Sequence, residues 1–597
     1  MKRLPFRLNN PVPVRFRGFR PRLALVVALV ALLGLAIVWR AVDLQVIQHE
    51  KLARMARKQS RRVIRVKGRR GAIHDRYGGR LALSLKAKSF YAHPSLLKDP
   101  QRAALELGKA LSLPVDDLER RLSSDNPFVW LKRQVTPREA AAAQGLAIKG
   151  VGSTLEYRRI YPSRSTAAAL IGFTGIDSQG LEGLEYAYDS YLRGQERIQV
   201  VDVDALGRTF LRSGRGLPTG GGSITLTLHP GIQHIAEKEL ERAVRLSEAK
   251  VGVVLVMHTP TGEILALAQA PGFNPNDFRN YDKSAFFNRA VTSGYEPGST
   301  FKVITAAAAL ESATAKPGDL FFCEEGSFVH YDSVIHDTKP YGWLSMDRVI
   351  QVSSNICAAK IGMAVPVPFF HDLIGRLGFG RRLGLFNAPD GRRLAGEAEG
   401  YVLPAAKWTP VDHAAISFGH GILVSPLQLT VAVNTIANGG RMMKPILVKE
   451  IRSPSGEVIE RNRPTVVARV LSPRTAATVR DFMLGVVSEK GTGRRAAMAS
   501  YQVAGKTGTT EKYDIKARGY SKTRHIASFV RFVPAYRPVL TILALVEEPQ
   551  KGRYGGVVAA PVFRRIAAAA LPLLGVWPGG EVRRLAGGAG GSGLAAK

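Results

Sequence analysis

The first of three short motifs that could do chemistry is a serine followed three residues later by a lysine, Ser299 and Lys302. Pro297 precedes the serine and an alanine-rich apolar run follows it, which predicts a helix that begins at or near Ser299. Residues three apart share a helix face, so the Lys302 amine can reach the Ser299 hydroxyl. A serine hydroxyl needs an adjacent base, and a lysine can serve if burial lowers its pKa. The pair is a candidate acyl-transfer site.

Ser-x-x-Lys is weak evidence by itself, because the same spacing recurs at Ser95 and Ser247. Any single instance is more often a solvated helix face than a site. Pro100 would end a helix soon after Ser95, and Ser247 lies late in a charged amphipathic segment. Of the three serines, Ser299 alone opens a long apolar helix.

Two further motifs follow in order. Ser353–Asn355 (Ser-Ser-Asn) supplies a hydroxyl and a carboxamide, which suit proton relay and the binding of a substrate amide. Lys506–Thr509 (Lys-Thr-Gly-Thr) follows the strand-like run Tyr501–Gly505, and it offers a cation and hydroxyls to a carboxylate. Its glycine would let a substrate backbone approach a strand edge closely. Ser124–Asn126 (Ser-Asp-Asn) also fits the second pattern, but Pro127 follows it at once and indicates a turn.

The three motifs, in this order, resemble those of the penicillin-recognising serine transferases. The middle residue of the second motif is Ser354 rather than the aspartate of class A β-lactamases, which favours penicillin-binding proteins. Flanking segments resemble class B penicillin-binding proteins, and the resemblance covers most of the chain beyond the N-terminal apolar run. These segments are residues 70–76, 180–185, 288–291, 417–421, 425–429, 554–556 and 560–563.

That resemblance implies an α+β protein, in which a non-catalytic pedestal of mixed α/β structure precedes a transpeptidase domain with an antiparallel sheet covered by helices. It implies a D,D-transpeptidase that cross-links peptidoglycan stem peptides ending in D-Ala-D-Ala, without cofactor or metal. The compact layout looks most like the cell-division (septal) enzymes, and the elongation-specific enzymes are the close alternative. A membrane-embedded glycan polymerase and other division proteins are the implied partners.

The resemblance also implies a role for each motif. The implied catalytic residues are Ser299, Lys302, Ser353, Asn355 and Lys506, and the implied substrate-binding residues are Lys506, Thr507, Gly508 and Thr509. Lys302 would accept the proton as Ser299 attacks the penultimate D-alanine carbonyl, and Ser353 would pass it to the departing D-alanine. The N–H groups of Ser299 and Thr509 would form the oxyanion hole. β-Lactams would acylate the same serine and remain there.

The net charge of the chain is also compatible with other classes of protein. The formal net charge is +36, which could reflect nucleic acid, an anionic membrane surface or an acidic polymer as partner. The sequence has no zinc-finger spacing and no RNA-recognition signature, so lipid and the carboxylates of a cell-wall polymer fit better. Two alternatives remain open: a β-lactam sensor or scaffold without turnover, and a basic nucleic-acid-binding protein with chance motifs.

The N-terminus predicts a membrane anchor. Residues 1–22 carry seven Lys or Arg and no acidic residue, and residues 23–39 are an unbroken apolar run. Seventeen residues are near the lower limit for a spanning helix, and no small-x-small cleavage site follows. We therefore expect residues 23–42 to span the inner membrane, with residues 1–22 in the cytoplasm and the rest outside it.

The remaining chain is expected to form a pedestal over residues 43–219, a transpeptidase domain over 220–577 and a disordered Gly- and Ala-rich tail over 578–597. Strand-like runs at 223–228, 251–257, 263–268, 526–533 and 539–546 predict the catalytic sheet. A helix is expected over 349–364 and another over 558–574. The two cysteines, Cys323 and Cys357, are expected to be buried free thiols, although a pair is open if the domain faces an oxidising compartment.

Overall fold

The computed structural model describes residues 19–203, 209–210, 219–392, 396–514 and 519–578, and its chain forms two compact units. The first unit comprises residues 1–67 and 196–218. It contains helices α1 (Phe19–Val42) and α2 (His49–Ser60), and an antiparallel ribbon of β1 (Arg61–Lys67), β6 (Glu196–Val203) and β7 (Thr209–Phe210). Most of the predicted cytoplasmic tail, residues 1–18, lies outside the described residues. The predicted C-terminal tail also lies outside them, apart from Pro578.

Helix α1 continues through a short π-helical segment, and together they give an apolar stretch over Pro21–Ile47. The stretch is 27 residues long, and none of its most apolar window is buried. At about 1.5 Å per residue, this length suffices to cross the hydrocarbon core of a bilayer. The helix therefore fits the predicted membrane anchor.

The second unit comprises residues 68–195 and 219–597. One half of this unit is built on a seven-stranded sheet. Its strand order is β17-β16-β8-β2-β3-β4, with β5 also paired to β3. The strands are β2 (Ile73–His74), β3 (Arg80–Ala92), β4 (Val129–Lys132), β5 (Val151–Ile160), β8 (Ser223–Leu226), β16 (Val448–Arg452) and β17 (Val458–Arg461). Because β2 pairs in parallel with β8, strands from before and after the predicted domain boundary at residues 219–220 share one sheet.

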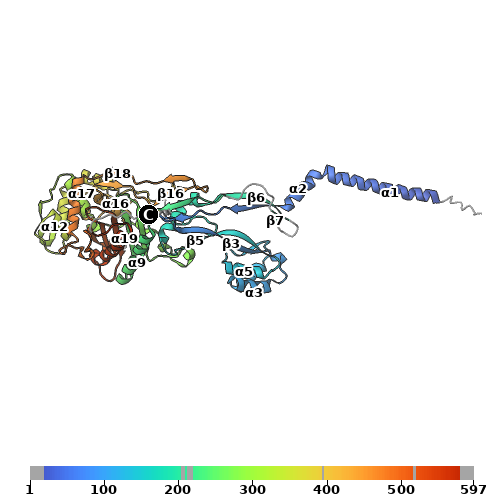
Figure 1. Cartoon of the computed structure of the whole chain (residues 1–597), viewed down its shortest axis with the longest axis horizontal. Helices are drawn as coiled ribbons and strands as arrows, with labels where there is room; N and C mark the ends of the chain where they lie inside the picture. The colour runs from blue at the N-terminus through green and yellow to red at the C-terminus, as the bar shows by residue number, and fades with distance from the viewer. Residues whose placement is uncertain (1–18, 204–208, 211–218, 393–395, 515–518, 579–597) are drawn as a thin grey trace, which may run out of the picture. The chain divides into compact units, whose positions relative to one another are not determined.

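A small helical subdomain covers the far end of β3 (Figure 1). It contains α3 (Pro100–Leu111), α4 (Val115–Leu122) and α5 (Pro137–Gly145). Its own apolar cluster includes Phe90 of β3 and Leu107 of α3, each at most 2% exposed. Asp99 and Thr136 cap α3 and α5 through their side chains, which explains where both helices begin.

A buried ion-pair network joins this half of the unit together. The guanidinium of Arg70 lies 2.6 Å from Glu185 and 2.5 Å from Asp189, and that of Arg159 lies 2.7 Å from Glu185. The Tyr161 hydroxyl also donates to Glu185, over 3.2 Å. Burial alone would raise the pKa of Glu185, but Arg159 and Arg70 outweigh it and hold that pKa below its ordinary value.

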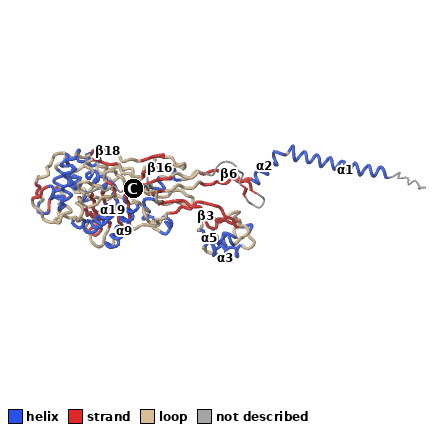
Figure 2. The backbone as a smooth tube through the Cα atoms, in the orientation of Figure 1, coloured by secondary structure: helices blue, strands red, loops and turns tan. Residues whose placement is uncertain are grey.

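The catalytic half is built on a five-stranded antiparallel sheet in the order β10-β9-β21-β20-β19. The strands are β9 (Val251–His258), β10 (Ile264–Ala270), β19 (Ala504–Asp514), β20 (Gly519–Val533) and β21 (Leu540–Glu547). Helices α9 (Pro230–Ser247) and α19 (Ala560–Leu573) lie side by side against the sheet (Figure 2). The other face packs against α11 (Lys302–Glu311) and α16 (Pro426–Ala437).

Alternation along β9 explains the two layers. Val254 and Val256 pack in the apolar cluster of α9 and α19, whereas Val253, Leu255 and Met257 pack in the cluster of α11 and α16. Successive strand residues point to opposite faces, so a strand apolar at every position must be covered on both sides. The predicted fold, an antiparallel sheet covered by helices, is confirmed.

The structure differs from the sequence predictions in two places near the motifs. The helix expected over 349–364 is two helices, α12 (Met346–Val352) and α13 (Asn355–Met363). Ser353 separates them in the left-handed conformation, with φ of 68°. The strand expected over 501–505 begins only at Ala504, so the Lys-Thr-Gly-Thr motif lies within strand β19 rather than after it.

Candidate active site

Ser299 lies at the start of α11. A 3-10 turn, η5 (Gly298–Thr300), leads into α11, and Phe301 between them keeps helical dihedral angles. Lys302 therefore follows Ser299 by one turn, as predicted. Ser299 is half-buried, whereas Gly298 and Thr300 on either side are buried.

Two glycines let this turn approach the edge strand β19. A Cβ added to Gly298 would lie 2.3 Å from the Thr510 hydroxyl, and one added to Gly508 would lie 2.8 Å from a methyl carbon of Thr300. Gly298 also has a positive φ of 52°, which disfavours other residues. The first-turn N–H groups of a helix lack intrahelical acceptors, and here that turn lies against the strand that carries Thr509.

Lys302 is fully buried and its amine is held by the second motif. Its Nζ donates to the carbonyl oxygen of Ser353 over 2.6 Å and to Oδ1 of Asn355 over 2.6 Å, and lies 3.3 Å from Ser353 Oγ. Burial lowers the pKa of Lys302 to about 7, although the negative charge of Asp337 opposes the shift. A substantial fraction of this amine is therefore neutral at neutral pH.

Lys506 approaches the same hydroxyl from β19. Its Nζ donates to Ser353 Oγ over 2.8 Å and to the Thr507 carbonyl over 3.0 Å. Burial and the nearby charge of Lys302 hold the pKa of Lys506 well below its ordinary value. The left-handed Ser353 interrupts the helix so that its hydroxyl lies between two lysines, which a continuous helix over 349–364 would not allow.

Asp337 fixes the second motif, and sequence reasoning missed it. Ser354 Oγ donates to Asp337 Oδ2 over 2.5 Å, and the backbone N–H groups of Asn355 and Ile356 donate to Oδ1, the latter over 3.2 Å. A carboxylate at a helix N-terminus satisfies free N–H groups and favours the helix dipole. Asn355 Nδ2 also donates to the carbonyl of His336 over 2.9 Å. Asp337 belongs to no motif, so only the fold reveals its role.

Glu296, just before the turn that contains Ser299, is the centre of a second polar group. Glu296 Oε1 accepts hydrogen bonds from the Gly421 N–H and the Tyr520 hydroxyl, both over 2.9 Å. His420 Nδ1 lies 3.9 Å from Glu296 Oε2. Burial and the charge of Lys302 lower the pKa of His420 to about 4, so this imidazole is neutral at neutral pH. Glu296 thus fastens the turn before Ser299 to the segment that carries His420.

The other Ser-x-x-Lys and Ser-x-Asn sites are local structure. Ser95 lies exposed in a 3-10 turn over Pro94–Leu96, and Ser124 Oγ donates to the carbonyl of Arg121. Ser247 ends α9 and donates to the Ala243 carbonyl over 2.7 Å. The sequence-based choice of Ser299 over these alternatives stays a prediction.

The expectation of two free thiols is wrong. Cys323 and Cys357 form a disulfide, with their Cα atoms 5.1 Å apart. The sequence does not predict this disulfide, because the two cysteines are 34 residues apart. They meet only where the end of one short strand packs against helix α13.

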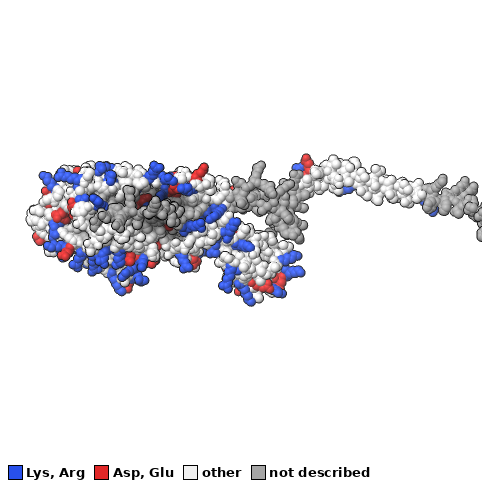
Figure 3. Space-filling model, in the orientation of Figure 1, with Lys and Arg blue, Asp and Glu red and all other residues white. Residues whose placement is uncertain are grey.

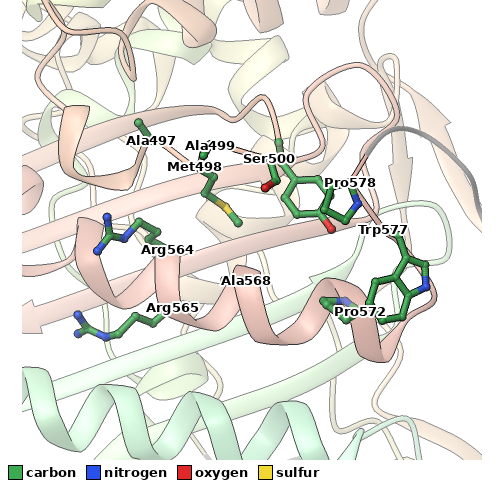
Figure 4. Close-up of a pocket in the computed structure, with 11 residues that line it drawn as sticks. Ala497, Met498, Ala499, Ser500, Arg564, Arg565, Ala568, Pro572, Trp577 and Pro578 are labelled. Carbon is green, nitrogen blue, oxygen red and sulfur yellow. The ribbon is translucent and has the colours of Figure 1, made fainter.

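A cavity of about 480 Å³ lies beside α19, remote in sequence from the first two motifs (Figure 4). Residues 497–501 and 564–578 line it, and they include Met498, Tyr501 and Trp577 as well as Arg564 and Arg565. The groups that could catalyse acyl transfer are instead those around Ser353 Oγ.

Comparisons with known proteins agree with this site. The model of the penicillin-binding protein transpeptidase domain matches residues 252–568, and that of the penicillin-binding protein dimerisation domain matches residues 65–226. The chain is 33% identical to the probable peptidoglycan D,D-transpeptidase PenA of Neisseria meningitidis, over 93% of each chain. It is 32% identical to the peptidoglycan D,D-transpeptidase FtsI of Escherichia coli K12, over 93% of this chain and 91% of that one.

Among solved structures, penicillin-binding protein 3 of Mycobacterium tuberculosis with aztreonam superposes with a TM-score of 0.68 at 26% identity. That match covers 87% of this chain and 99% of the other. Fold and site together define a serine-type acyltransferase. The chain belongs to the class B penicillin-binding proteins and is FtsI-like, and its activity is that of a peptidoglycan D,D-transpeptidase.

Proposed function

We propose that Ser299 is the nucleophile of this transpeptidase and that Lys302 is its base. The observation that carries the proposal is the convergence of Lys302 and Lys506 on Ser353, with Lys302 also held by Asn355 and lying one helical turn from Ser299. The neutral Lys302 amine takes the proton as Ser299 Oγ bonds to the carbonyl carbon of the penultimate D-alanine. N–H groups of Ser299 and Thr509 receive the oxyanion, each worth about 3–4 kcal/mol of barrier.

Collapse of the tetrahedral intermediate needs a proton on the leaving nitrogen. Ser353 Oγ, within reach of both lysines, passes the proton from Lys302 to the departing D-alanine as the C–N bond breaks. Thr507 and Thr509 bind the terminal carboxylate through their hydroxyls, and its charge raises the fraction of Lys506 that is protonated. Gly508 allows the close backbone approach. An amine of a second stem peptide then attacks the acyl-enzyme.

Acyl transfer is tested with the full chain in detergent micelles. Incubation with a stem pentapeptide ending in D-Ala-D-Ala, together with an amine-bearing stem peptide, should release D-alanine and give the cross-linked product. Prior acylation with penicillin should block both. A chain that binds penicillin covalently but yields neither D-alanine nor product would instead be the β-lactam sensor without turnover.

The pH dependence of acylation tests the role of Lys302. Its pKa of about 7 predicts that the acylation rate rises about tenfold per pH unit at lower pH and levels off above pH 7, because only the neutral amine is a base. Stopped-flow measurements of a fluorescent penicillin over pH 5–9 check this. A rate that stays flat from pH 5 to pH 7 would contradict the assignment, and Lys302→Met should lose the rising limb.

We further propose that this transpeptidase serves division at the septum, with residues 1–22 in the cytoplasm and the catalytic unit outside the inner membrane. The similarity to FtsI and the basic residues before α1 support this arrangement. A membrane-embedded glycan polymerase and other division proteins are the proposed partners. A fluorescent fusion should gather at the division plane, and uniform placement along the lateral wall would favour the elongation-specific alternative.

Surface charge fits an anionic polymer as the substrate. On the face shown in Figure 3, Lys and Arg side chains gather over α9 and α19. The exposed basic residues of these two helices include Lys238, Arg242, Arg245 and Arg564. Positive charge of this kind raises the local concentration of polymeric carboxylates and weakens with salt.

A further inference from the structure

The segment between α11 and α12 has little core of its own. It consists of two short ribbons, β11 (Leu320–Phe322) with β14 (Trp343–Ser345) and β12 (Ser327–His330) with β13 (Ser333–His336). Large apolar side chains along it are exposed: Leu320, Val329, Tyr331, Val334 and Trp343, by 51–71%. Two-stranded ribbons are marginally stable alone, so this segment depends on what fastens it to the rest of the unit.

Three ties fasten the segment to helix α13 at successive positions. Asp337 binds the helix N-terminus at residues 354–356. The disulfide joins Cys323 to Cys357, and both cysteines are fully buried. One turn further on, Lys360 Nζ donates to the Phe322 carbonyl over 2.8 Å and pairs with Glu324. The disulfide is the covalent tie among the three, and it lies between the other two along the helix.

The same helix turn carries Asn355, whose side-chain amide links Lys302 of α11 to the segment. Its Oδ1 accepts from Lys302, while its Nδ2 donates to the carbonyl of His336 in the segment. If the segment moved off α13, Asn355 would lose the His336 contact and the Asp337 carboxylate at its N–H. The Lys302 amine would then lose a fixed acceptor.

We propose that the Cys323–Cys357 disulfide is a positioning group of the active site. It holds the segment bearing His336 and Asp337 against α13, and so fixes the contact between Asn355 and Lys302 on which acylation of Ser299 depends. The inference rests on the proposed roles of Lys302 and Asn355. It makes full activity a property of the chain with its cysteines oxidised.

A covalent tie matters here because the hydrogen-bonded ties can open locally. The free energy of local opening is small where few apolar contacts are lost, and this segment buries few. Closing a 34-residue loop by a disulfide lowers the chain entropy that opening would gain. Without it, the sheet and its helices would remain folded while the segment detached part of the time. Misplacement of a catalytic group by about 1 Å can cost about 100-fold in rate.

The test compares the full chain with its Cys323→Ala/Cys357→Ala variant, both in detergent micelles. We expect the second-order rate of Ser299 acylation by a fluorescent penicillin to fall about 10- to 100-fold. The pH midpoint of that rate should also move, because the environment of Lys302 changes. Leu240→Ala is the matched control: this buried residue of α9 packs on the other side of the sheet, so its loss should lower the unfolding temperature and leave the acylation rate and midpoint unchanged.

Reduction of the folded wild-type chain provides a second route if the double variant does not fold. A dithiol such as dithiothreitol transfers two hydrogens to the disulfide, which becomes two thiols while the reductant closes to its own disulfide. The reduced chain should acylate at the lowered rate and recover on reoxidation. Where the double variant does fold, its acylation rate should not respond to the reductant.

Either of two results would overturn the inference. One is a folded variant or reduced chain that acylates at the wild-type rate with an unchanged pH midpoint. The other is a loss of rate that merely follows the loss of stability, as it would if Leu240→Ala slowed acylation equally. Failure of the wild-type chain to acylate at Ser299 at all would instead refute the proposed function.

Discussion

Ser299→Ala should abolish covalent labelling of the full chain by a fluorescent penicillin and leave its unfolding temperature unchanged. Alanine removes the oxygen that forms the acyl bond, and loss of a serine nucleophile costs about 10⁶-fold in turnover in a well-studied serine enzyme. The hydroxyl is only half-buried at the head of α11, so its removal should change the free energy of unfolding by at most about 0.5 kcal/mol. Gel fluorescence and a thermal melt give the two measurements.

Ser95→Ala is the matched control, because it changes the same residue type in the same four-residue pattern. Ser95 is exposed in a turn of the helical subdomain, and labelling should persist at the wild-type level. The assignment of the nucleophile would be refuted by labelled Ser299→Ala, or by loss of labelling in a folded Ser95→Ala.

Glu185→Ala should lower the free energy of unfolding by about 3–5 kcal/mol, because it removes the carboxylate that pairs with the buried Arg159 guanidinium and leaves Arg70 with Asp189 alone. The side chains of Arg70 and Arg159 are 1% and 4% exposed, and Glu185 is completely buried between them. The arginines hold the pKa of Glu185 below its ordinary value of 4.5. The ion pairs of Glu185 with the two arginines therefore stabilise the fold fully above pH 4.5. Their contribution to the free energy of unfolding falls as the pH drops toward the folded-state pKa of Glu185.

The change is measured as the unfolding midpoint of the full chain in micelles at pH 7. Glu106→Ala is the control for loss of an ion pair, since Glu106 pairs with Arg102 on the surface of α3 and such pairs contribute less than about 1 kcal/mol. Equal midpoints for the two variants would show that the buried network contributes no more than a surface pair.

Local geometry explains why the sequence predicts that Ser299 and Lys302 lie close together. Ser299 and Lys302 are one helical turn apart, so their proximity follows from local geometry alone. The apolar run over residues 251–257 also predicts a strand, and the structure forms β9 there, covered by helices on each side. These inferences need only residue types and spacing, which the printed sequence contains.

Contacts between distant segments could not be predicted in the same way. Asp337 lies 17 residues before Ser354 and matches no motif, and Ser353 has a residue type with no preference for the left-handed conformation it adopts. Cys323 and Cys357 could be judged only as two thiols, and the expectation that both are free was wrong. Each of these features depends on which segment lies against α13.

The sequence by itself therefore determined the class of chemistry, the order of the motifs, the helix that follows Ser299 and the apolar N-terminal span. Tertiary structure decided the lowered pKa of Lys302, because burial depends on every element packed around the amine. It likewise decided the convergence of two lysines on Ser353, the clamp of Asp337 and the disulfide. The physical reason is that residue type and spacing act within a few turns of chain, whereas desolvation and long-range hydrogen bonds arise only when distant segments pack together.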